Sequence, residues 1–394
     1  MIQHECSLAA VCNLDTTRIS EVSTFRMTVR MLLDMQTRGQ LAAGISTYSP
    51  DRSELIKTYK DIGTVDRVFD LAQPNKFEQT EAMFNGAMTI GHTRYATVGG
   101  DDKRYAQTVE RRHGQLWKWF AFAFNGTLSN YSYLRDQLSE EKNFHFILDS
   151  DAEVIEHYIA HNLRGDQIPN LVSVLGKLAK RFDGAYCIVM LDATGRLMIA
   201  RDPLGMRPLN WAQQDGVFAA ASESSALQNA GFRDIYAVEP GEIIVVQNGE
   251  IAKTRYVESR RKAHCFFEWV YFANVASTID GKGVYESRAA AGRTLAQRED
   301  VQVDDETIVV PVPDTAKAAA DSFAFNLGIP CVEGIFRNRF IGRTFIQTKN
   351  TRIDAAKSKY TPLPTVLRGK KVFLIEDSIV RSNTLNAIMG IMKT

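Results

Sequence analysis

Cysteine is scarce in this sequence, and the few cysteines present are scattered. Five of them are spread over 394 residues, and no two have the C-x-x-C spacing. Disulfide frameworks and zinc ribbons need cysteines in closely spaced groups, so the sequence argues against both kinds of scaffold. Each cysteine must therefore be judged alone: Cys6, Cys12, Cys187, Cys265 and Cys331.

An excess of charge of one sign is also missing, as are long apolar runs. The chain has 47 basic and 46 acidic residues, which gives a net charge of +1. No segment approaches the roughly 18 uninterrupted apolar residues of a membrane span, and residues 1–15 lack the features of a signal peptide. We therefore expect a soluble cytoplasmic protein that binds neither nucleic acid nor membrane.

Proline is infrequent as well, with 11 residues, whereas 45% of the residues are hydrophobic and 24% are charged. This composition excludes a disordered or collagen-like chain and leaves enough apolar material for real cores. A length of 394 residues is two or three times the usual domain size. We therefore expect two domains, each of roughly 100 to 250 residues.

The first part of the chain, up to about Gln247, alternates short apolar runs with helical patterns. The runs that predict strands are Cys6–Cys12, Ala42–Tyr48, Trp119–Phe124, Cys187–Leu191, Leu197–Ala200 and Ile243–Val246. A helix is predicted over Asp151–His161, where apolar residues recur at helical spacing and Asp149, Ser150 and Asp151 offer cap oxygens at the start. This part is therefore one large mixed α/β unit.

A basic stretch without an apolar period, residues 252–264, separates this unit from the rest. We place the domain boundary there, between a first domain of residues 6–250 and a second domain of residues 264–394. The second domain alternates strands and helices, which predicts a parallel sheet. Its predicted elements are the strands Ile308–Val312 and Val372–Ile375 and the helices Thr315–Leu327 and Thr384–Met392.

Two adjacent acids end the last predicted strand. Glu376 and Asp377 are followed by a short turn rich in hydroxyl groups, which then opens a helix. Unpaired N–H groups at a helix start suit a phosphate, and two acids at a strand tip suit a vicinal diol, so the loop predicts a ribose 5-phosphate site. An ordinary capped turn with solvated acids is the alternative, and the loop alone does not separate the two.

Cys6 opens the first predicted strand. A cysteine at such a place is more often part of the buried core than a nucleophile, so alone it indicates little. The motifs further along the chain give it its importance.

Two sets of motifs resemble known families. The segment 371–384, together with 310–316 and 336–347, is similar to the phosphate loop, pyrophosphate loop and mobile loop of type I phosphoribosyltransferases. A second set resembles the glutamine-binding elements of amino-terminal-nucleophile glutaminases, and its members are Gln36–Gln40, Gly91–Thr97, Phe124–Asn130, Ser150–Glu153, Arg201–Pro208, Ser222–Ser224 and Pro240–Glu242. The two sets in one chain resemble the glutamine phosphoribosylpyrophosphate amidotransferase family, over residues 6–392.

This resemblance implies a fold of two parts. An amino-terminal αββα sandwich of the Ntn-hydrolase type is followed by a parallel-sheet phosphoribosyltransferase domain. Family members continue beyond the position of Thr394, so the second domain is expected to be truncated. Four cysteines hold an iron–sulfur cluster in some members; Cys265 matches the first and the others would lie beyond Thr394, so no cluster is expected.

The resemblance also assigns the glutamine site. Cys6 would be the nucleophile, after removal of a leader, Met1–Glu5. A free α-amine has a pKa of about 7.7 to 8.0 and can act as base for the thiol, whereas an internal amide nitrogen cannot. The other implied site residues are Asn125 and Gly126 for the oxyanion hole and Arg94, Thr97 and Asp151 for glutamine. A turn dipeptide, a surface ion pair and a helix cap are the ordinary alternatives for Asn125-Gly126, Arg94 and Asp151.

In the second domain the resemblance assigns phosphoribosyl pyrophosphate and Mg²⁺. The implied substrate residues are Asp314, Thr315, Arg343, Glu376, Asp377, Ser378, Arg381, Ser382, Asn383 and Thr384, of which Thr315, Glu376 and Asp377 match metal-associated positions. Two of the family's glycines are replaced, by Ala316 and Ser382, and a Cβ there can obstruct a backbone that must approach phosphate or adopt a positive φ.

The implied activity is the first step of purine synthesis, in which ammonia from glutamine displaces pyrophosphate from the sugar. Nucleotide feedback inhibitors and a homo-oligomer are further implications of the family. Two alternatives stay open: a catalytically weakened paralogue that binds phosphoribosyl compounds or nucleotides as a regulator, and a glutaminase whose transferase half is only a scaffold.

Overall fold

The computed structural model describes residues 6–15, 22–95, 100, 102–142, 144–338, 360–379 and 382–392. The chain divides into two compact units. Unit 1 comprises Met1–Cys265 and Thr278–Gly281, and unit 2 comprises Phe266–Ser277 and Lys282–Thr394. Among the described residues, no helix is both long and apolar enough to cross a membrane.

The first sheet of unit 1 is antiparallel and has the strand order β11-β9-β10-β1-β4-β2-β3. Its strands are β1 (Ser7–Asn13), β2 (Ala42–Tyr48), β3 (Ile56–Ile62), β4 (Met88–Arg94), β9 (Asn210–Gln214), β10 (Val217–Ala221) and β11 (Ile235–Ala237). Strand β1 lies at the centre, between β10 and β4, and all seven of its residues are buried. A strand that is covered on both faces appears in the sequence as a continuous apolar run, which is why strand β1 could be predicted.

The second sheet has the order β13-β12-β8-β7-β6-β5. Its strands are β5 (Val109–Arg111), β6 (Phe120–Leu128), β7 (Gly184–Asp192), β8 (Arg196–Arg201), β12 (Glu242–Gln247) and β13 (Glu250–Arg255). The predicted strands of unit 1 are all present; β2 has the predicted bounds, and the ends of the others differ by a few residues. Strand β13 was not expected, because it is an exposed edge strand without an apolar pattern, and it takes up residues that we predicted to begin the linker.

The period of two along each strand builds the layers of unit 1. In β1, Leu8, Ala10 and Cys12 belong to the core between the two sheets. Ala9 and Val11 face the opposite way and pack with one set of helices: α1 (Thr24–Asp34), α2 (Val65–Val68), α3 (Pro74–Phe84) and α7 (Ser224–Asn229). In β6 the phenylalanines pack against the other set: α4 (Tyr131–Lys142), α5 (Asp151–Asn162) and α6 (Leu171–Ala179).

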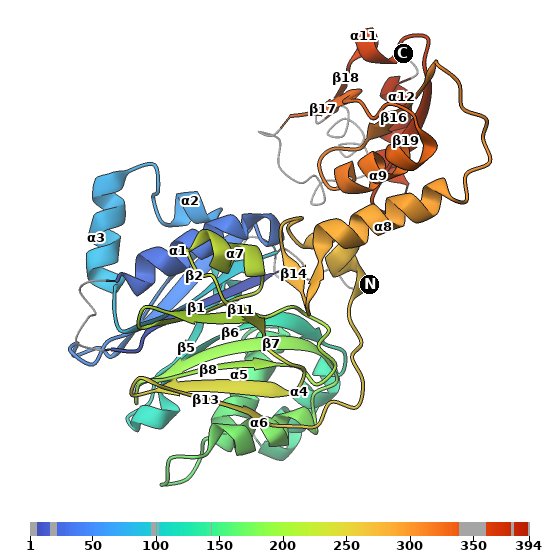
Figure 1. Cartoon of the computed structure of the whole chain (residues 1–394). Coiled ribbons are helices and arrows are strands. Elements are labelled where there is room, and N and C mark those ends of the chain that lie inside the picture. The colour runs from blue at the N-terminus through green and yellow to red at the C-terminus, as the bar shows by residue number, and fades with distance from the viewer. Residues whose placement is uncertain are drawn as a thin grey trace. The chain divides into compact units, whose positions relative to one another are not determined.

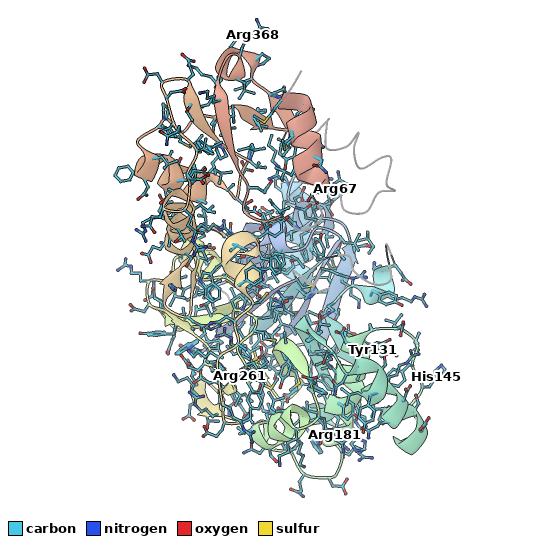
Figure 2. All side chains as sticks on the ribbon, turned by 90° about the vertical axis from the view of Figure 1, so that its right-hand side faces the viewer. Arg67, Tyr131, His145, Arg181, Arg261 and Arg368 are labelled. Carbon is cyan, nitrogen blue, oxygen red and sulfur yellow. The ribbon has the colours of Figure 1, made fainter. Side chains whose placement is uncertain are left out.

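Unit 1 is thus an αββα sandwich, and the predicted fold class is confirmed. Figure 1 shows the two stacked sheets with one set of helices on each outer face. Tyr131 from α4 and Arg181, just after α6, are labelled in Figure 2 on the same outer layer. Short 3₁₀ helices cover Gln36–Arg38, Lys103–Tyr105 and Leu116–Lys118.

The helix predicted over Asp151–His161 is confirmed as α5. Its N-cap is Ser150, whose side chain accepts from the backbone N–H of Glu153. The cap satisfies one of the N–H groups that a helix start leaves unpaired and fixes where the helix begins. Asp151 is therefore held at the first position of the helix, at the end that faces strand β6.

Unit 2 contains a parallel strand pair, as predicted. Strand β16 (Thr307–Pro311) pairs in parallel with β19 (Lys371–Ile375). Helix α9 (Lys317–Leu327) follows β16 in the chain and packs against this strand pair. Its further elements are α8 (Val284–Ala296), α11 (Pro364–Leu367), α12 (Asn383–Met392), β15 (Lys282–Gly283), β17 (Ile335–Arg337), β18 (Tyr360–Pro362) and a π-helical turn over Glu268–Phe272. Strand β14 (Thr278–Ile279) belongs to the short segment assigned to unit 1.

Candidate functional site

Cys6 precedes strand β1 and lies between the two sheets of unit 1. Its even-numbered neighbours Leu8, Ala10 and Cys12 face the inter-sheet core, and the period of a strand gives Cys6 the same direction. The side chain is buried. Strand β1 pairs with β4 in a register that places Ser7 opposite Thr93, so the next pair outward is Cys6 and Arg94.

Arg94 ends strand β4 and is also buried. Its Nη1 donates to the carbonyl oxygen of Gly100 at 3.3 Å, and its guanidinium carbon lies 5.3 Å from the ring centroid of Tyr105. The backbone here is closely approached by Gly39, where a Cβ would lie 2.7 to 2.8 Å from backbone atoms of Thr93 and Arg94. Only glycine allows this contact, which brings the motif 36–40 against the arginine.

Asn125 reaches the same inter-sheet layer from strand β6. Ala121 and Ala123 belong to the core between the sheets, and Asn125 follows them on the same face. Its Nδ2 donates to Ser222 Oγ at 3.4 Å, and the backbone N–H of Leu8 donates to the same oxygen at 2.9 Å. Ser222 therefore ties Asn125 to the strand that carries Cys6.

Gly126 occupies a position where no other residue fits. A Cβ there would lie 1.9 Å from the carbonyl oxygen of Ala185 on the neighbouring strand β7. The sequence suggested a turn dipeptide as the alternative for Asn125-Gly126, and that alternative is wrong, because both residues lie inside strand β6.

Asp151 is the partly buried carboxylate of the site. Its Oδ2 accepts from the backbone N–H of Leu128, the last residue of β6, at 3.4 Å. Burial raises the pKa of Asp151 to about 6, although backbone N–H groups, including that of Leu128, act in the opposite direction. The carboxylate is therefore charged at neutral pH and becomes protonated just below pH 6.

The thiol of Cys6 is surrounded by charges of both signs. Burial raises its pKa, while a hydrogen bond from the backbone of Tyr95 and the positive charges of Arg207 and Arg94 lower it, and the charge of Asp151 raises it. Cys12 differs, since burial alone raises its pKa to about 12. Charges that can stabilise a thiolate thus gather at Cys6 and not at the cysteine six residues further along the same strand.

A buried ion pair supports the backbone of Cys6. Arg38 donates through Nε to the carbonyl oxygen of Cys6 at 3.3 Å and through Nη1 to Glu223 Oε1 at 2.9 Å, and both side chains are almost fully buried. The sequence marked the motifs that contain Arg38, Arg207, Ser222 and Glu223 but assigned these four residues no role. Their long separation in the sequence left no local signal of the contacts.

The acids of unit 2 lie at the carboxyl ends of two parallel strands. The register pairs Pro311 with Ile375, so the residues that follow β16 and β19 emerge side by side. Thr315 donates to Oδ2 of Asp377, and Ser378 Oγ donates to its Oδ1 at 2.6 Å. The backbone N–H of Asp377 donates to Glu376 Oε1 at 3.2 Å. The structure therefore brings these four residues together.

Two further residues adjoin this cluster. Arg337 Nη1 donates to Asp314 Oδ2 at 3.1 Å. Burial raises the pKa of Tyr360 to about 12, with Arg337 lowering it and the charges of Glu376 and Asp377 raising it, so its hydroxyl stays protonated beside the acids. Arg337 belongs to the segment 336–347 that resembles the mobile loop, but the sequence assigned it no contact in the site, and Tyr360 was not predicted as a site residue.

Several predicted site residues lie outside the described part of the chain: Thr97, Arg343, Arg381 and the side chains of Asn383 and Thr384. Ser382 is described, and its φ of 55° lies in the left-handed region that favours glycine. Ala316 has φ −78° and ψ −10°, a conformation open to any residue. Of the two replaced glycines, the backbone argument therefore applies to Ser382 and does not apply to Ala316.

Comparisons with known proteins agree with both halves of this arrangement. Residues 93–229 match the family model described as a glutamine amidotransferase domain. The amidophosphoribosyltransferase of Methanothermobacter thermautotrophicus is 36% identical over 365 residues, covering 92% of this chain and 73% of the relative. That of Mycobacterium tuberculosis is 34% identical, covering 93% of this chain and 67% of the relative.

A solved structure extends the likeness to three dimensions. The glutamine phosphoribosylpyrophosphate amidotransferase of B. subtilis, in complex with ADP and GMP, superposes with a TM-score of 0.83 at 29% identity. The match covers 98% of this chain and 79% of that one.

Proposed function

The chain belongs to the amidophosphoribosyltransferase family, and we propose that it transfers ammonia from glutamine to phosphoribosyl pyrophosphate, the first step of purine synthesis. The products are 5-phosphoribosylamine, pyrophosphate and glutamate. The observation that carries this proposal is the buried thiol of Cys6 among Arg94, Asp151 and Asn125. A cation, an anion and a nucleophile in one buried place match the carboxylate, the ammonium and the side-chain amide of glutamine.

In the glutamine half, the sulfur of Cys6 attacks the side-chain amide carbon. The oxygen of the tetrahedral intermediate is bound by Asn125 Nδ2 and the Gly126 N–H, and one such donor contributes about 2.7 to 4 kcal/mol in other enzymes. The C–N bond then breaks, the departing amide nitrogen takes up the proton that the thiol gave to the base and leaves as ammonia, and water hydrolyses the thioester to glutamate. Arg94 holds the α-carboxylate and Asp151 the α-ammonium of the substrate.

This chemistry requires a base next to a buried thiol whose pKa is raised. The α-amine of Cys6 would be that base, with a pKa of about 7.7 to 8.0, once residues 1–5 have been removed. We expect the intact mass of the active protein to correspond to a chain that begins at Cys6, and glutamine hydrolysis to stay low until phosphoribosyl pyrophosphate is added. A fully active protein that retains Met1–Glu5 would overturn the mechanism.

The raised pKa of Asp151 predicts how glutamine binding depends on pH. The folded-state pKa is about 6, so the carboxylate that binds the ammonium is present above pH 6 and lost below it. We expect the KM for glutamine to rise by about tenfold per pH unit below this pKa, because only the charged form binds. The measurement is KM for glutamine between pH 5 and 8.

A matched pair of variants tests this assignment. Asp151→Asn should raise KM at pH 7.5 and flatten its pH profile, whereas Asp149→Asn, which changes an exposed neighbour paired with Arg135, should leave the profile as in the native protein. A native KM that stays constant down to pH 5 would refute the role of Asp151.

In the sugar half, we propose that Glu376 and Asp377 bind the ribose hydroxyls and that residues 378–384 bind the 5-phosphate. Oxygen donors suit Mg²⁺, and the residues that would hold it are Thr315, Glu376 and Asp377. In the described residues no group of three or more His, Cys, Asp or Glu could hold a metal by itself, and Mg²⁺ usually completes its shell with substrate phosphates and water. When bound, the ion would neutralise charge on the departing pyrophosphate.

Ser382 favours one alternative, a glutaminase whose transferase half is a scaffold. A non-glycine residue at φ 55° is strained by roughly 1 to 2 kcal/mol, in the turn that would bind the phosphate. Product formation from phosphoribosyl pyrophosphate and free ammonia separates the two functions: it is expected for the amidotransferase and absent for the scaffold.

Purine nucleotides are the feedback inhibitors that we propose, acting on a homo-oligomer. The support for the nucleotides is the B. subtilis relative, which is described in complex with ADP and GMP, and the homo-oligomer is proposed from the sequence resemblance to the family.

A further inference from the structure

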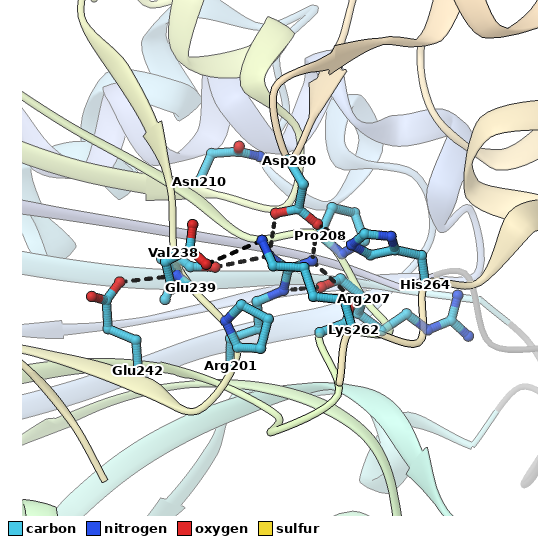
Figure 3. Close-up of polar contacts among 12 residues, drawn as sticks. Arg201, Arg207, Pro208, Asn210, Val238, Glu239, Glu242, Lys262, His264 and Asp280 are labelled. Carbon is cyan, nitrogen blue, oxygen red and sulfur yellow. Dashed lines mark hydrogen bonds and ion pairs between the residues drawn. The ribbon is translucent and has the colours of Figure 1, made fainter. Parts of the chain in front are cut away.

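Arg201 is a fully buried arginine whose five N–H donors are all used. It donates through Nε to the carbonyl of Arg207 at 2.7 Å, through Nη1 to that of Val238 at 2.8 Å and through Nη2 to that of Gly205 at 2.9 Å. The two remaining donors form a bidentate pair with Asp280, at 2.7 Å and 2.9 Å. Figure 3 shows this network, which we call the Arg201–Asp280 clasp.

The clasp fixes the segment 202–208. Two of its three carbonyl contacts, at Gly205 and Arg207, lie in this segment, and the Asp202 carboxylate accepts from the backbone N–H groups of Leu204 and Met206. The segment forms a tight loop that begins at the end of β8. A loop held by a fully paired buried arginine has little freedom to move unless the pair is broken.

This loop adjoins the glutamine site. Cys187 Sγ contacts the carbonyl oxygen of Arg207 at 3.7 Å, and Cys187 is the strand partner of Asn125 in the pairing of β7 with β6. The positive charge of Arg207 acts on the thiol of Cys6. The carbonyl that Arg201 holds thus belongs to a residue that contacts the strand partner of Asn125 and whose charge acts on the thiol of Cys6.

Asp280 is the part of the clasp that is distant in the sequence. It has a φ of 48°, its side chain is 5% exposed, and its Oδ2 lies 2.6 Å from His264 Nε2. Burial raises the pKa of Asp280, but Arg201, His264 and Lys262 outweigh this and hold it below its usual value. The residue is therefore a carboxylate at neutral pH, and the charge of Arg201 is matched.

We propose that Asp280 and Arg201 are positioning residues for glutamine hydrolysis, which hold the segment 202–208 so that Arg207 stays beside Cys6. The proposal rests on the proposed function. Asp280 touches no reacting atom; it fixes Arg201, Arg201 fixes the Arg207 carbonyl, and the side chain of Arg207 stabilises the thiolate and the developing negative charge.

Asp280→Asn is the variant that tests the clasp. Asparagine tolerates a left-handed φ, so the turn at residue 280 is kept while the charge and one acceptor oxygen are lost. We expect kcat/KM for glutamine to fall at least tenfold. The apparent pKa of Cys6, measured from the pH dependence of its alkylation by iodoacetamide with peptide mass mapping, should rise by about one unit, because Arg94 and Asp151 remain in place and only Arg207 is released.

The matched control is Glu239→Gln. Glu239 lies in the same region of Figure 3, and its carboxylate pairs with Lys262 at 3.1 Å, whereas the carboxylate that pairs with Arg201 is that of Asp280. It should leave both readouts within twofold of the native protein. If Asp280→Asn fails to fold, His264→Gln removes a contact to the same carboxylate from a partly exposed position, and it should move both readouts in the same direction by a smaller amount.

The outcomes separate this proposal from the proposed function. A native protein that hydrolyses glutamine, with Asp280→Asn folded and unchanged in both readouts, overturns the clasp alone. A native protein that hydrolyses no glutamine overturns the proposed function and the clasp with it. A fall in kcat/KM that is matched by Glu239→Gln, without a shift of the alkylation profile, would show a general structural effect and also overturn the clasp.

Discussion

Replacing Cys6 with alanine is expected to abolish product formation from glutamine while product formation from free ammonia continues. In the proposed mechanism the sulfur is the atom that forms the thioester, and alanine has no group that can take its place. Removal of a nucleophile lowers kcat by roughly a thousandfold or more in other enzymes. The two activities are compared at saturating phosphoribosyl pyrophosphate, once with glutamine and once with an excess of ammonium salt at alkaline pH.

The glutamine-dependent and ammonia-dependent activities should separate because the two proposed substrate sites lie in different units. The residues proposed to bind glutamine belong to unit 1, whereas the acids at the tip of β19 belong to unit 2. Free ammonia needs no thiol, because it is already the nucleophile that displaces pyrophosphate. The variant therefore removes the supply of ammonia and leaves its use intact.

Cys12→Ala is the matched control. Cys12 is a buried thiol on the same strand and the same face, but burial raises its pKa to about 12, and at neutral pH it is not a thiolate. We expect activity with glutamine to be kept and stability to fall by about 1 kcal/mol, from the small cavity. Glutamine-dependent activity that survives Cys6→Ala, or that is lost equally in Cys12→Ala, would contradict the assignment.

The sequence carries those parts of the fold that depend on local pattern. The strand β2 was predicted with its observed bounds, and α5 within one residue, because a buried strand and a capped helix each leave a signal in consecutive residues. The exposed strand β13 leaves none, since its stability comes from pairing with β12 and not from an apolar face.

The site residues also divide into those that a sequence pattern predicts and those that only the structure reveals. Arg94 and Asp151 were identified as members of motifs, and Cys6 from the family that these motifs resemble. Strand register places Arg94 next to Cys6, and the charge of Asp151 acts on the same thiol. The ion pair of Arg38 with Glu223 joins residues 185 positions apart, so nothing in either neighbourhood predicts it. The sequence shows that Ser382 replaces a glycine of the family, but only its positive φ in the structure shows that the replacement strains the backbone.

Asp377→Asn is expected to lower product formation with both nitrogen sources, whereas Cys6→Ala lowers it with glutamine alone. Product formation should fall by about a hundredfold or more with either glutamine or ammonia, because both routes end at the same sugar. Asp377 accepts from Thr315 and from Ser378 Oγ, and asparagine offers only one acceptor oxygen to these two hydroxyls. The loss of charge also removes a carboxylate from the proposed diol and Mg²⁺ site.

Asp304→Asn is the control within unit 2. Asp304 pairs with Lys371, at the amino end of β19, whereas Asp377 follows the carboxyl end of the same strand. Ligands of parallel sheets bind at the carboxyl ends of strands, so a charge lost at the amino end should leave both activities within twofold. Equal losses in the two variants would mean that the acids stabilise the unit and do not bind the sugar.

Basal glutamine hydrolysis gives the decisive contrast between the two substitutions. Asp377→Asn leaves Cys6, Arg94 and Asp151 unchanged, so hydrolysis measured without the sugar substrate should match the native rate. The additional hydrolysis on adding phosphoribosyl pyrophosphate should be lost, because the variant no longer binds the sugar. A variant that keeps this stimulation but makes no product would place Asp377 in the displacement step itself and not in binding. In that case KM for phosphoribosyl pyrophosphate in the ammonia reaction would stay near its native value while kcat falls.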